Sequence, residues 1–290
     1  MKTYLLNHLT IGNGETIAYR RTGGNFDTGK PTIVLIHGNM SSSVHWQTTM
    51  EQLEAVGYSV VAPDLRGFGE SSYEQSFDSL AELASDVQAL IHELALESMV
   101  LVGWSLGGGV ALELATQLSG KVKQVVTLGS VPVTGYPIYA KDTNGQPILT
   151  ERYTTKEQVA SDPVQVVPML SAIESQNRDF IQLVLSHSLY ALKKPAEAEF
   201  EAYTEAVFKQ RCLVDANHAL LKFNFESSTL PCPLHMIHGG LDAIVPLAWA
   251  QASADAIGEY GKLIVLDGMA HSFPTEDMKR FINTLTEVIS

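Results

Sequence analysis

The sequence predicts an α/β fold, in which a mostly parallel sheet carries helices on both faces and an inserted helical cap. Two observations support this prediction. Short apolar runs, typical of strands that are buried on both faces, alternate with segments of helical periodicity. The alternation stops between residues 131 and 228, a stretch too long for a plain loop, and then resumes. We therefore expect a core formed by residues 1–130 and 229–290, with residues 131–228 forming the cap.

The expected elements follow one another in chain order. A leading hairpin, residues 4–9 and 16–21, turns at the Gly-Asn-Gly of residues 12–14. Buried strands are expected at residues 32–36, 59–62, 99–102, 124–128, 233–237 and 262–266. Apolar residues at helical spacing predict helices near 80–94 and 110–118, and a further helical pattern at 196–210 lies within the cap. Ser79 or Asp78 is suited to cap the first helix, and Gly120 ends the second.

The composition is that of a globular protein. Of the 290 residues, 45% are hydrophobic and 18% are charged, which excludes disordered and collagen-like classes. The 19 Lys and Arg against 32 Asp and Glu give a net charge of −13, which argues against nucleic-acid partners and anionic membranes. The two cysteines, Cys212 and Cys232, cannot form a disulfide framework. No signal-peptide pattern and no apolar run of ~18 residues is found, so we expect a cytoplasmic monomer or small homo-oligomer without membrane insertion.

The strongest local signal is Gly103-Trp104-Ser105-Leu106-Gly107, which follows a predicted strand and opens a predicted helix. Small residues on both sides of the serine permit a sharp turn in which neighbouring backbone comes close. The hydroxyl then stands at a helix N-terminus, where the dipole favours developing negative charge. We take Ser105 as the candidate nucleophile.

A serine nucleophile needs a base, and the base needs an acid that fixes its tautomer. His271 follows the last predicted strand, and Asp242 follows the strand before it. Adjacent strands lie ~5 Å apart, so loops at their carboxyl ends can bring these side chains into contact. The chain order of Ser105, Asp242 and His271 is the one found in α/β-hydrolases. Asp267 and Asp64 are the competing acids, and Asp267 is expected to brace the turn before His271.

The candidate oxyanion hole combines two backbone N–H groups. One belongs to Leu106, after the nucleophile, and the other to Asn39 in the first strand-to-helix loop, with Met40 as the second choice. Met40 and Trp104 are the expected substrate-binding residues, because their neighbours fix them at the site. The aromatic and methionine side chains of the cap are expected mainly to pack its helices onto the core: Tyr136, Tyr139, Met169, Phe180, Tyr190, Phe200, Tyr203 and Phe208.

These motifs together resemble the α/β-hydrolase superfamily over nearly the whole chain. The matching segments are residues 37–39, 64–71, 103–108, 239–242 and 268–271. The closer resemblance is to the bacterial group of helical-capped esterases, lactonases, carbon–carbon bond hydrolases and cofactor-free haloperoxidases. It implies catalysis without a metal or organic cofactor. Because the turn holds Ser rather than Asp, haloalkane dehalogenase and epoxide hydrolase chemistry is disfavoured.

We therefore predict a serine hydrolase that cleaves a small carboxylic ester or lactone through an acyl-enzyme. Three alternatives stay open: a carbon–carbon bond hydrolase, a cofactor-free haloperoxidase or perhydrolase on the same site, and a hydrolase-like ligand receptor with little turnover. The remaining polar residues are given structural roles. Asp64 and Arg66 are expected in an ion pair or turn network, and His238 in a turn. No metal site is expected, since His235 and His238 would point to opposite faces of one strand.

Overall fold

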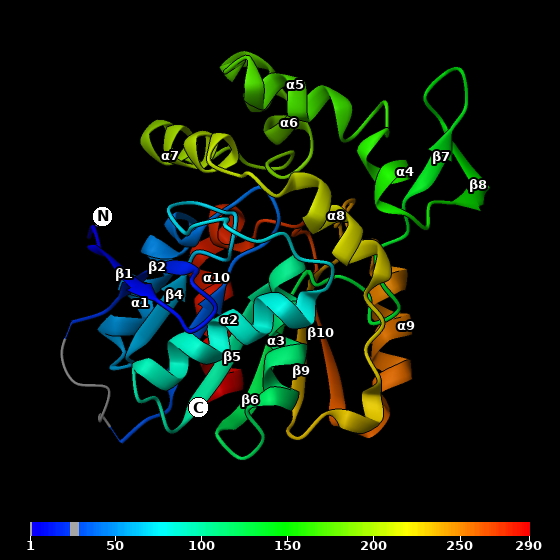
Figure 1. Cartoon of the computed structure of the whole chain (residues 1–290). Helices are drawn as coiled ribbons and strands as arrows, with labels where there is room; N and C mark the ends of the chain where they lie inside the picture. The colour runs from blue at the N-terminus through cyan, green and yellow to red at the C-terminus, as the bar shows by residue number, and fades with distance from the viewer. Residues whose placement is uncertain (1, 24–28) are drawn as a thin grey trace.

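The computed structural model describes residues 2–23 and 29–290 and is built around one eight-stranded sheet (Figure 1). The strands lie in the order β1-β2-β4-β3-β5-β6-β9-β10. Their bounds are β1 (Leu6–Thr10), β2 (Thr16–Arg21), β3 (Thr32–Ile36), β4 (Val60–Pro63), β5 (Met99–Trp104), β6 (Val122–Leu128), β9 (Leu234–Gly239) and β10 (Gly261–Leu266). In the described part of this sheet, β2 pairs antiparallel with β1 and with β4 and the other pairings are parallel, so the prediction of a mostly parallel sheet is confirmed.

Two layers of helices cover the sheet, because alternate residues of each buried strand point to opposite faces. In β3, Val34 and Ile36 belong to the hydrophobic cluster that includes residues of α2 (Leu80–Glu93), α3 (Leu106–Gln117) and α9 (Leu247–Ile257). Ile33 and Leu35 belong instead to the cluster on the other face, which includes residues of α1 (Gln47–Ala55) and α10 (Phe273–Ile289). The N-cap of α2 is Ser79, whose side chain accepts the Glu82 N–H. The nearly continuous apolar runs of the sequence are thus strands with both faces buried, as predicted.

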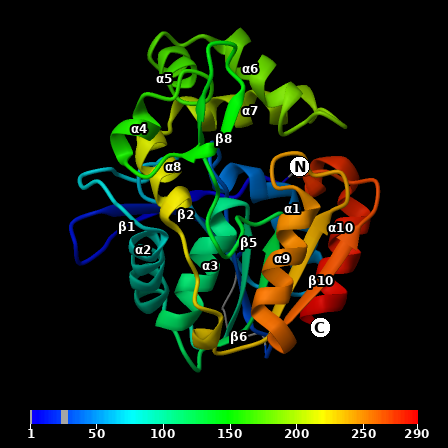
Figure 2. The ribbon, with the colours of Figure 1, turned by 90° about the vertical axis from the view of Figure 1, so that its right-hand side faces the viewer.

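The segment between β6 and β9, here called the insertion (residues 131–228), lies over the carboxyl ends of the parallel strands (Figures 1 and 2). It contains α4 (Lys156–Ala160), α5 (Val167–Glu174), α6 (Arg178–His187), α7 (Glu197–Phe208) and α8 (Leu213–Lys222), and η2 (Ser227–Thr229) at its end. The expected helical content is present. The assignment of this segment as a separate domain with these boundaries stays a prediction.

The insertion also holds a two-stranded hairpin that the sequence analysis did not predict, β7 (Tyr139–Lys141) and β8 (Pro147–Arg152). Its side chains are mostly exposed, so the alternation of apolar and polar residues that marks a half-buried strand is missing. The turn is held by Asp142, whose Oδ1 accepts the N–H groups of Asn144 and Gln146.

None of the helices within the described ranges is long and apolar enough to cross a bilayer.

Candidate active site

Ser105 stands on a turn between β5 and α3 that glycines make possible. A Cβ on Gly103 would lie 2.1 Å from the carbonyl oxygen of Gly107, and one on Gly107 would lie 2.3 Å from that of Ile36. The close packing forces Ser105 into φ 55°, ψ −119°, a conformation that non-glycine residues rarely adopt. The serine is held in this state by the bond from its N–H to Leu128 O (2.9 Å), and it lines a cavity at the start of α3.

Asp242 and His271 meet in the loops that follow β9 and β10. Nδ1 of His271 lies 2.7 Å from Oδ2 of Asp242, and both side chains are buried. The other carboxylate oxygen, Oδ1, accepts the N–H groups of Ile244 and Val245, each at 2.9 Å. Burial opposes ionisation of Asp242, but the bonds from His271 and from the backbone outweigh it and lower the pKa of this carboxyl. An ionised Asp242 holds the proton of His271 on Nδ1 and leaves Nε2 as the free acceptor.

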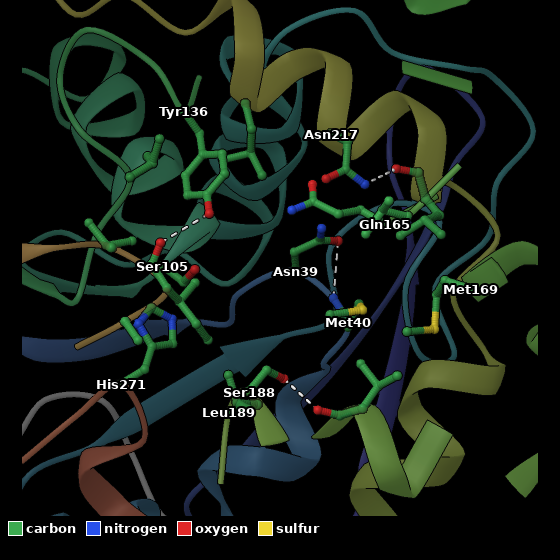
Figure 3. A pocket seen from close by; sticks show the side chains of 18 of the residues that line it. Asn39, Met40, Ser105, Tyr136, Gln165, Met169, Ser188, Leu189, Asn217 and His271 are labelled. Carbon is green, nitrogen blue, oxygen red and sulfur yellow. Dashed lines mark hydrogen bonds between the residues drawn. The ribbon is translucent and has the colours of Figure 1, made fainter. Parts of the chain in front are cut away.

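The ring of His271 lines the same cavity as Ser105 (Figure 3). Within the described part of the chain, no hydrogen bond joins the Ser105 hydroxyl to this ring, and such bonds often form only when substrate is bound. Trp104 contacts His271 through a hydrogen bond and through its ring. Its indole N–H donates to the carbonyl oxygen of His271 (3.0 Å), and the two rings lie 5.6 Å apart. Trp104 also lines the cavity, so the same side chain borders the site and positions the histidine.

The loop after β3 distinguishes between the two candidate oxyanion donors. The N–H of Met40 is already engaged by Oδ1 of Asn39 and Oε1 of Gln210, each at 3.0 Å. The backbone N–H of Asn39 donates to no group among the described residues. The N–H of Leu106, the first residue of α3, has no carbonyl one turn earlier to bond. These geometries favour Asn39 over Met40 as the partner of Leu106, and Met40 lines the cavity.

Gln210 is a residue of the site region that the sequence analysis missed. Gln210 lies in the insertion just after α7, and its side chain is buried. Its Oε1 accepts the Met40 N–H, and its Nε2 donates to Oδ1 of Asn39 (2.8 Å). Its neighbours contact the core as well: Lys209 pairs with Glu70, and the N–H of Arg211 donates to Gly67 O (2.8 Å). No motif marks such a residue, because its partners lie 170 positions away in the chain.

The other polar residues considered in the sequence have partners of their own. Asp64 accepts the N–H groups of Ser43 (2.7 Å) and Glu70 (2.9 Å), and Arg66 forms a buried two-bond pair with Asp86. Nε2 of His238 lies 2.8 Å from the carbonyl oxygen of Val245. Asp267, the competing acid, is exposed. His37 accepts the Leu65 N–H on Nε2 (2.9 Å), so its Nδ1 carries the proton toward Gly38 O (2.8 Å). Asp64 and His238 thus make turn and loop contacts, and Arg66 forms an ion pair with α2, as expected for these residues.

The cavity has a volume of about 380 Å³, which is in the range of small-molecule sites. Its lining combines Ser105, His271, Met40 and Trp104 with apolar side chains of the insertion. Of the aromatic and methionine side chains considered above, Tyr136, Met169 and Phe180 line it, whereas Tyr190 and Tyr203 are buried in packing contacts. Among the residues that the structure describes, no Asp, Glu, Lys or Arg lines the cavity. Over the same ranges, no group of three or more His, Cys, Asp or Glu side chains could hold a metal ion.

A mostly parallel sheet with a serine on the turn after its central strand β5, and a histidine and an aspartate after its last two strands, defines an α/β-fold hydrolase. The chain belongs to the alpha/beta hydrolase family, whose model matches residues 33–284. It is 26% identical over 277 residues to a non-heme haloperoxidase of Rhodococcus erythropolis, covering 92% of this chain and 93% of that protein. It is also 26% identical over 282 residues to a bifunctional esterase/perhydrolase of Acinetobacter calcoaceticus, covering 94% and 95% of the two chains. Among solved structures, a bromoperoxidase of Bacillus anthracis superposes on this chain with a TM-score of 0.74 at 23% identity, covering 98% of this chain and 99% of that one. At this identity the similarity is one of fold.

Proposed function

We propose that this hydrolase cleaves a small carboxylic ester or lactone with Ser105 as nucleophile, His271 as general base and acid, and Asp242 as the partner of His271. The observation that carries the proposal is the buried 2.7 Å contact of Asp242 with His271, whose ring lines the same cavity as Ser105. The cavity has the size of a small-molecule site, and no Asp, Glu, Lys or Arg among the described residues lines it, which suits a neutral substrate.

The reaction follows from the positions of these groups. Oγ of Ser105 attacks the ester carbonyl while Nε2 of His271 takes its proton, and the N–H groups of Leu106 and Asn39 stabilise the oxyanion. When the intermediate collapses, the bond to the alkoxide breaks and His271 returns the proton to the leaving alcohol. Water, deprotonated by the same nitrogen, then attacks the acyl-enzyme and releases the carboxylic acid and free Ser105. In a lactone, the alcohol and the acid stay in one molecule.

Perhydrolysis is a second candidate function for the same acyl-enzyme. It is supported by the relative named a bifunctional esterase/perhydrolase, which is similar over 94% of this chain. Hydrogen peroxide would replace water as the attacking group, so that the acyl bond to Ser105 breaks and a peracid leaves in place of the acid. Both reactions share every step up to the acyl-enzyme, so product analysis with and without peroxide separates them.

Labelling with a fluorophosphonate tests the nucleophile, because this probe reacts with activated serines. We expect stoichiometric labelling of Ser105 and multiple turnover on a panel that compares short p-nitrophenyl esters and lactones with amides. Ser105→Ala should lose the label and the turnover and keep the thermal unfolding midpoint of the parent chain. Wild-type turnover in this variant would contradict the proposal. Tight ligand binding without multiple turnover in the parent chain would instead favour the receptor alternative.

A further inference from the structure

Three polar side chains that line the cavity already donate a hydrogen bond within the protein. The hydroxyl of Tyr136 donates to Ile244 O (3.0 Å), and that of Ser188 donates to Val184 O (2.7 Å). The indole of Trp104 is bonded to His271 O. Apart from the proposed catalytic groups, this leaves the side-chain amides of Asn39, Gln165 and Asn217, here called the amide wall, which all line the cavity (Figure 3).

The hydrogen bonds that the amide wall makes within the protein show which of its atoms remain without a protein partner. Oδ1 of Asn39 accepts from the Met40 N–H (3.0 Å) and from Nε2 of Gln210 (2.8 Å), so its Nδ2 is the group left as a donor. Nδ2 of Asn217 donates to Leu213 O (2.8 Å), so its Oδ1 is left as an acceptor. The amide of Gln165, which supplies both a donor and an acceptor, has no partner among the described residues and points into the cavity (Figure 3).

The amide wall is assembled by three separate parts of the chain, and its most exposed member is anchored through the backbone. Asn39 comes from the loop after β3 and Asn217 from α8. The side chain of Gln165 is exposed, but its N–H donates to Oδ1 of Asp162 (2.7 Å). The other oxygen of Asp162 is 2.8 Å from Nζ of Lys141 in the β7–β8 hairpin, and both of these side chains are nearly inaccessible to solvent. The hairpin thus fixes the segment that carries Gln165.

We propose that the amide wall is a substrate subsite for a neutral group that both donates and accepts hydrogen bonds, a hydroxyl or a carboxamide, carried by the ester at a distance from its reacting carbonyl. The proposal rests on the proposed function. A donor from Asn39 and an acceptor from Asn217 in one cavity are complementary to such a group, and an all-apolar chain would leave these amides unpaired. A carboxylate would face Oδ1 of Asn217, and no Lys or Arg among the described residues lines the cavity, in a chain of net charge −13.

Three p-nitrophenyl esters with acyl chains of matched length test this subsite: the 4-acetamidobutanoate, the heptanoate and the monoester of heptanedioic acid. With the rate without enzyme subtracted, we expect kcat/KM to be about tenfold higher for the acetamido ester than for the heptanoate, as one or two net hydrogen bonds provide. The ester with the free carboxylate should be the poorest. Equal or better turnover of the heptanoate, or of the carboxylate ester, would overturn the subsite.

Near-isosteric variants assign the preference to the amide wall. Gln165→Met and Asn217→Leu should each lower the ratio of kcat/KM for the acetamido ester to kcat/KM for the heptanoate several-fold, because the hydrogen bonds to the acetamido group are lost and the heptanoate no longer leaves an amide unpaired. Gln251→Met, which removes an exposed glutamine amide on α9, is the matched control and should keep the full preference. A preference that survives in both cavity variants overturns the subsite while the proposed ester hydrolysis stands. If none of the three esters is hydrolysed and Ser105 is not labelled, the proposed function fails and the subsite fails with it.

Discussion

The indole N–H of Trp104 donates to the carbonyl oxygen of His271, so the residue before the proposed nucleophile holds the backbone of the proposed base. The two residues are 167 positions apart, and the bond is buried. A second bond fixes the same histidine from its ring, through Nδ1 and Asp242. His271 is therefore oriented from two sides before any substrate arrives, which is the preorganisation that general-base catalysis requires.

The acid of the site is tested by two asparagine variants. Asp242→Asn should lower kcat on the order of 10⁴-fold, the loss known for the equivalent change in a serine protease, because the amide favours the wrong tautomer of His271. Asp267→Asn should stay close to the parent, since that side chain is exposed and has no hydrogen-bond partner among the described residues, and the backbone carbonyl of Asp267 accepts from Arg280. Steady-state kinetics at neutral pH measure both variants. A crippled Asp267→Asn beside a near-normal Asp242→Asn would reverse the assignment.

Gly129 packs directly against the Asp242–His271 bond. A Cβ at this position would lie 3.1 Å from both Oδ2 of Asp242 and Nδ1 of His271, with φ at +49°. We expect Gly129→Ala to lower kcat on the order of 10²-fold, because small displacements of catalytic groups are costly. Gly120→Ala is the control, since Gly120 also has a positive φ (+90°) but nothing within 4 Å of its Cβ. Both variants lose some stability to backbone strain, so equal kcat values in the two would show that the contact is unimportant.

Gln210 connects the insertion to the loop that carries the proposed oxyanion donor. Gln210→Leu removes the bonds to Asn39 and Met40, and we expect kcat to fall about tenfold with KM changed less than about twofold, since an oxyanion donor acts in the transition state. Affinity for a boronic-acid transition-state analogue should weaken in parallel. Lys209→Met, which removes the neighbouring surface ion pair with Glu70, should leave both values unchanged. A change in KM alone would mean that Gln210 only shapes the cavity.

His45 gives the fold a pH-dependent stability. Burial, together with the nearby His37, lowers its pKa to about 3, against 6.5 for an exposed histidine. Between these pH values the unfolded chain binds a proton that the folded chain does not. The free energy of unfolding should therefore fall as pH falls from about 6.5 toward 3, by ~1.4 kcal/mol per pH unit from this residue.

Denaturant unfolding at several pH values measures this slope. His45→Phe keeps an aromatic ring against Tyr203, whose ring centroid lies 4.0 Å from that of His45, and should make the acid slope shallower by about one proton. His92→Phe replaces an exposed histidine on α2 and should not change the slope. An unchanged slope in His45→Phe would mean that His45 does not set the acid sensitivity.

The strands and the contact of Asp242 with His271 were accessible to sequence reasoning because both depend on local patterns. Each buried strand is a short apolar run, and the residues after β9 and β10 meet because these strands pair in register, from Gly261 with Leu234 to Leu266 with Gly239. The turn at Ser105 was predictable from its glycines, whose absent side chains allow the backbone contacts.

Features that depend on contacts between distant segments carried no such signal. Gln210 and the amide wall consist of ordinary polar residues, and only the fold brings the insertion and the β3 loop together. The β7–β8 hairpin escaped prediction because exposed strands do not need apolar alternation. Trp104 was expected to face substrate, and its bond to His271 could not be read from residues so far apart.

The insertion leaves the sheet after β6 and returns at β9, and these two strands are hydrogen-bonded neighbours, with Val126 opposite His235. The backbone hydrogen bonding of the sheet is therefore continuous from β6 to β9, although the insertion separates these strands in the sequence. An excursion of this kind can lengthen, shorten or be exchanged between relatives without disturbing strand register. Evolution can in this way change the substrate specificity while the sheet stays the same. A chimera that joins this sheet to another insertion is a rational route to new specificity.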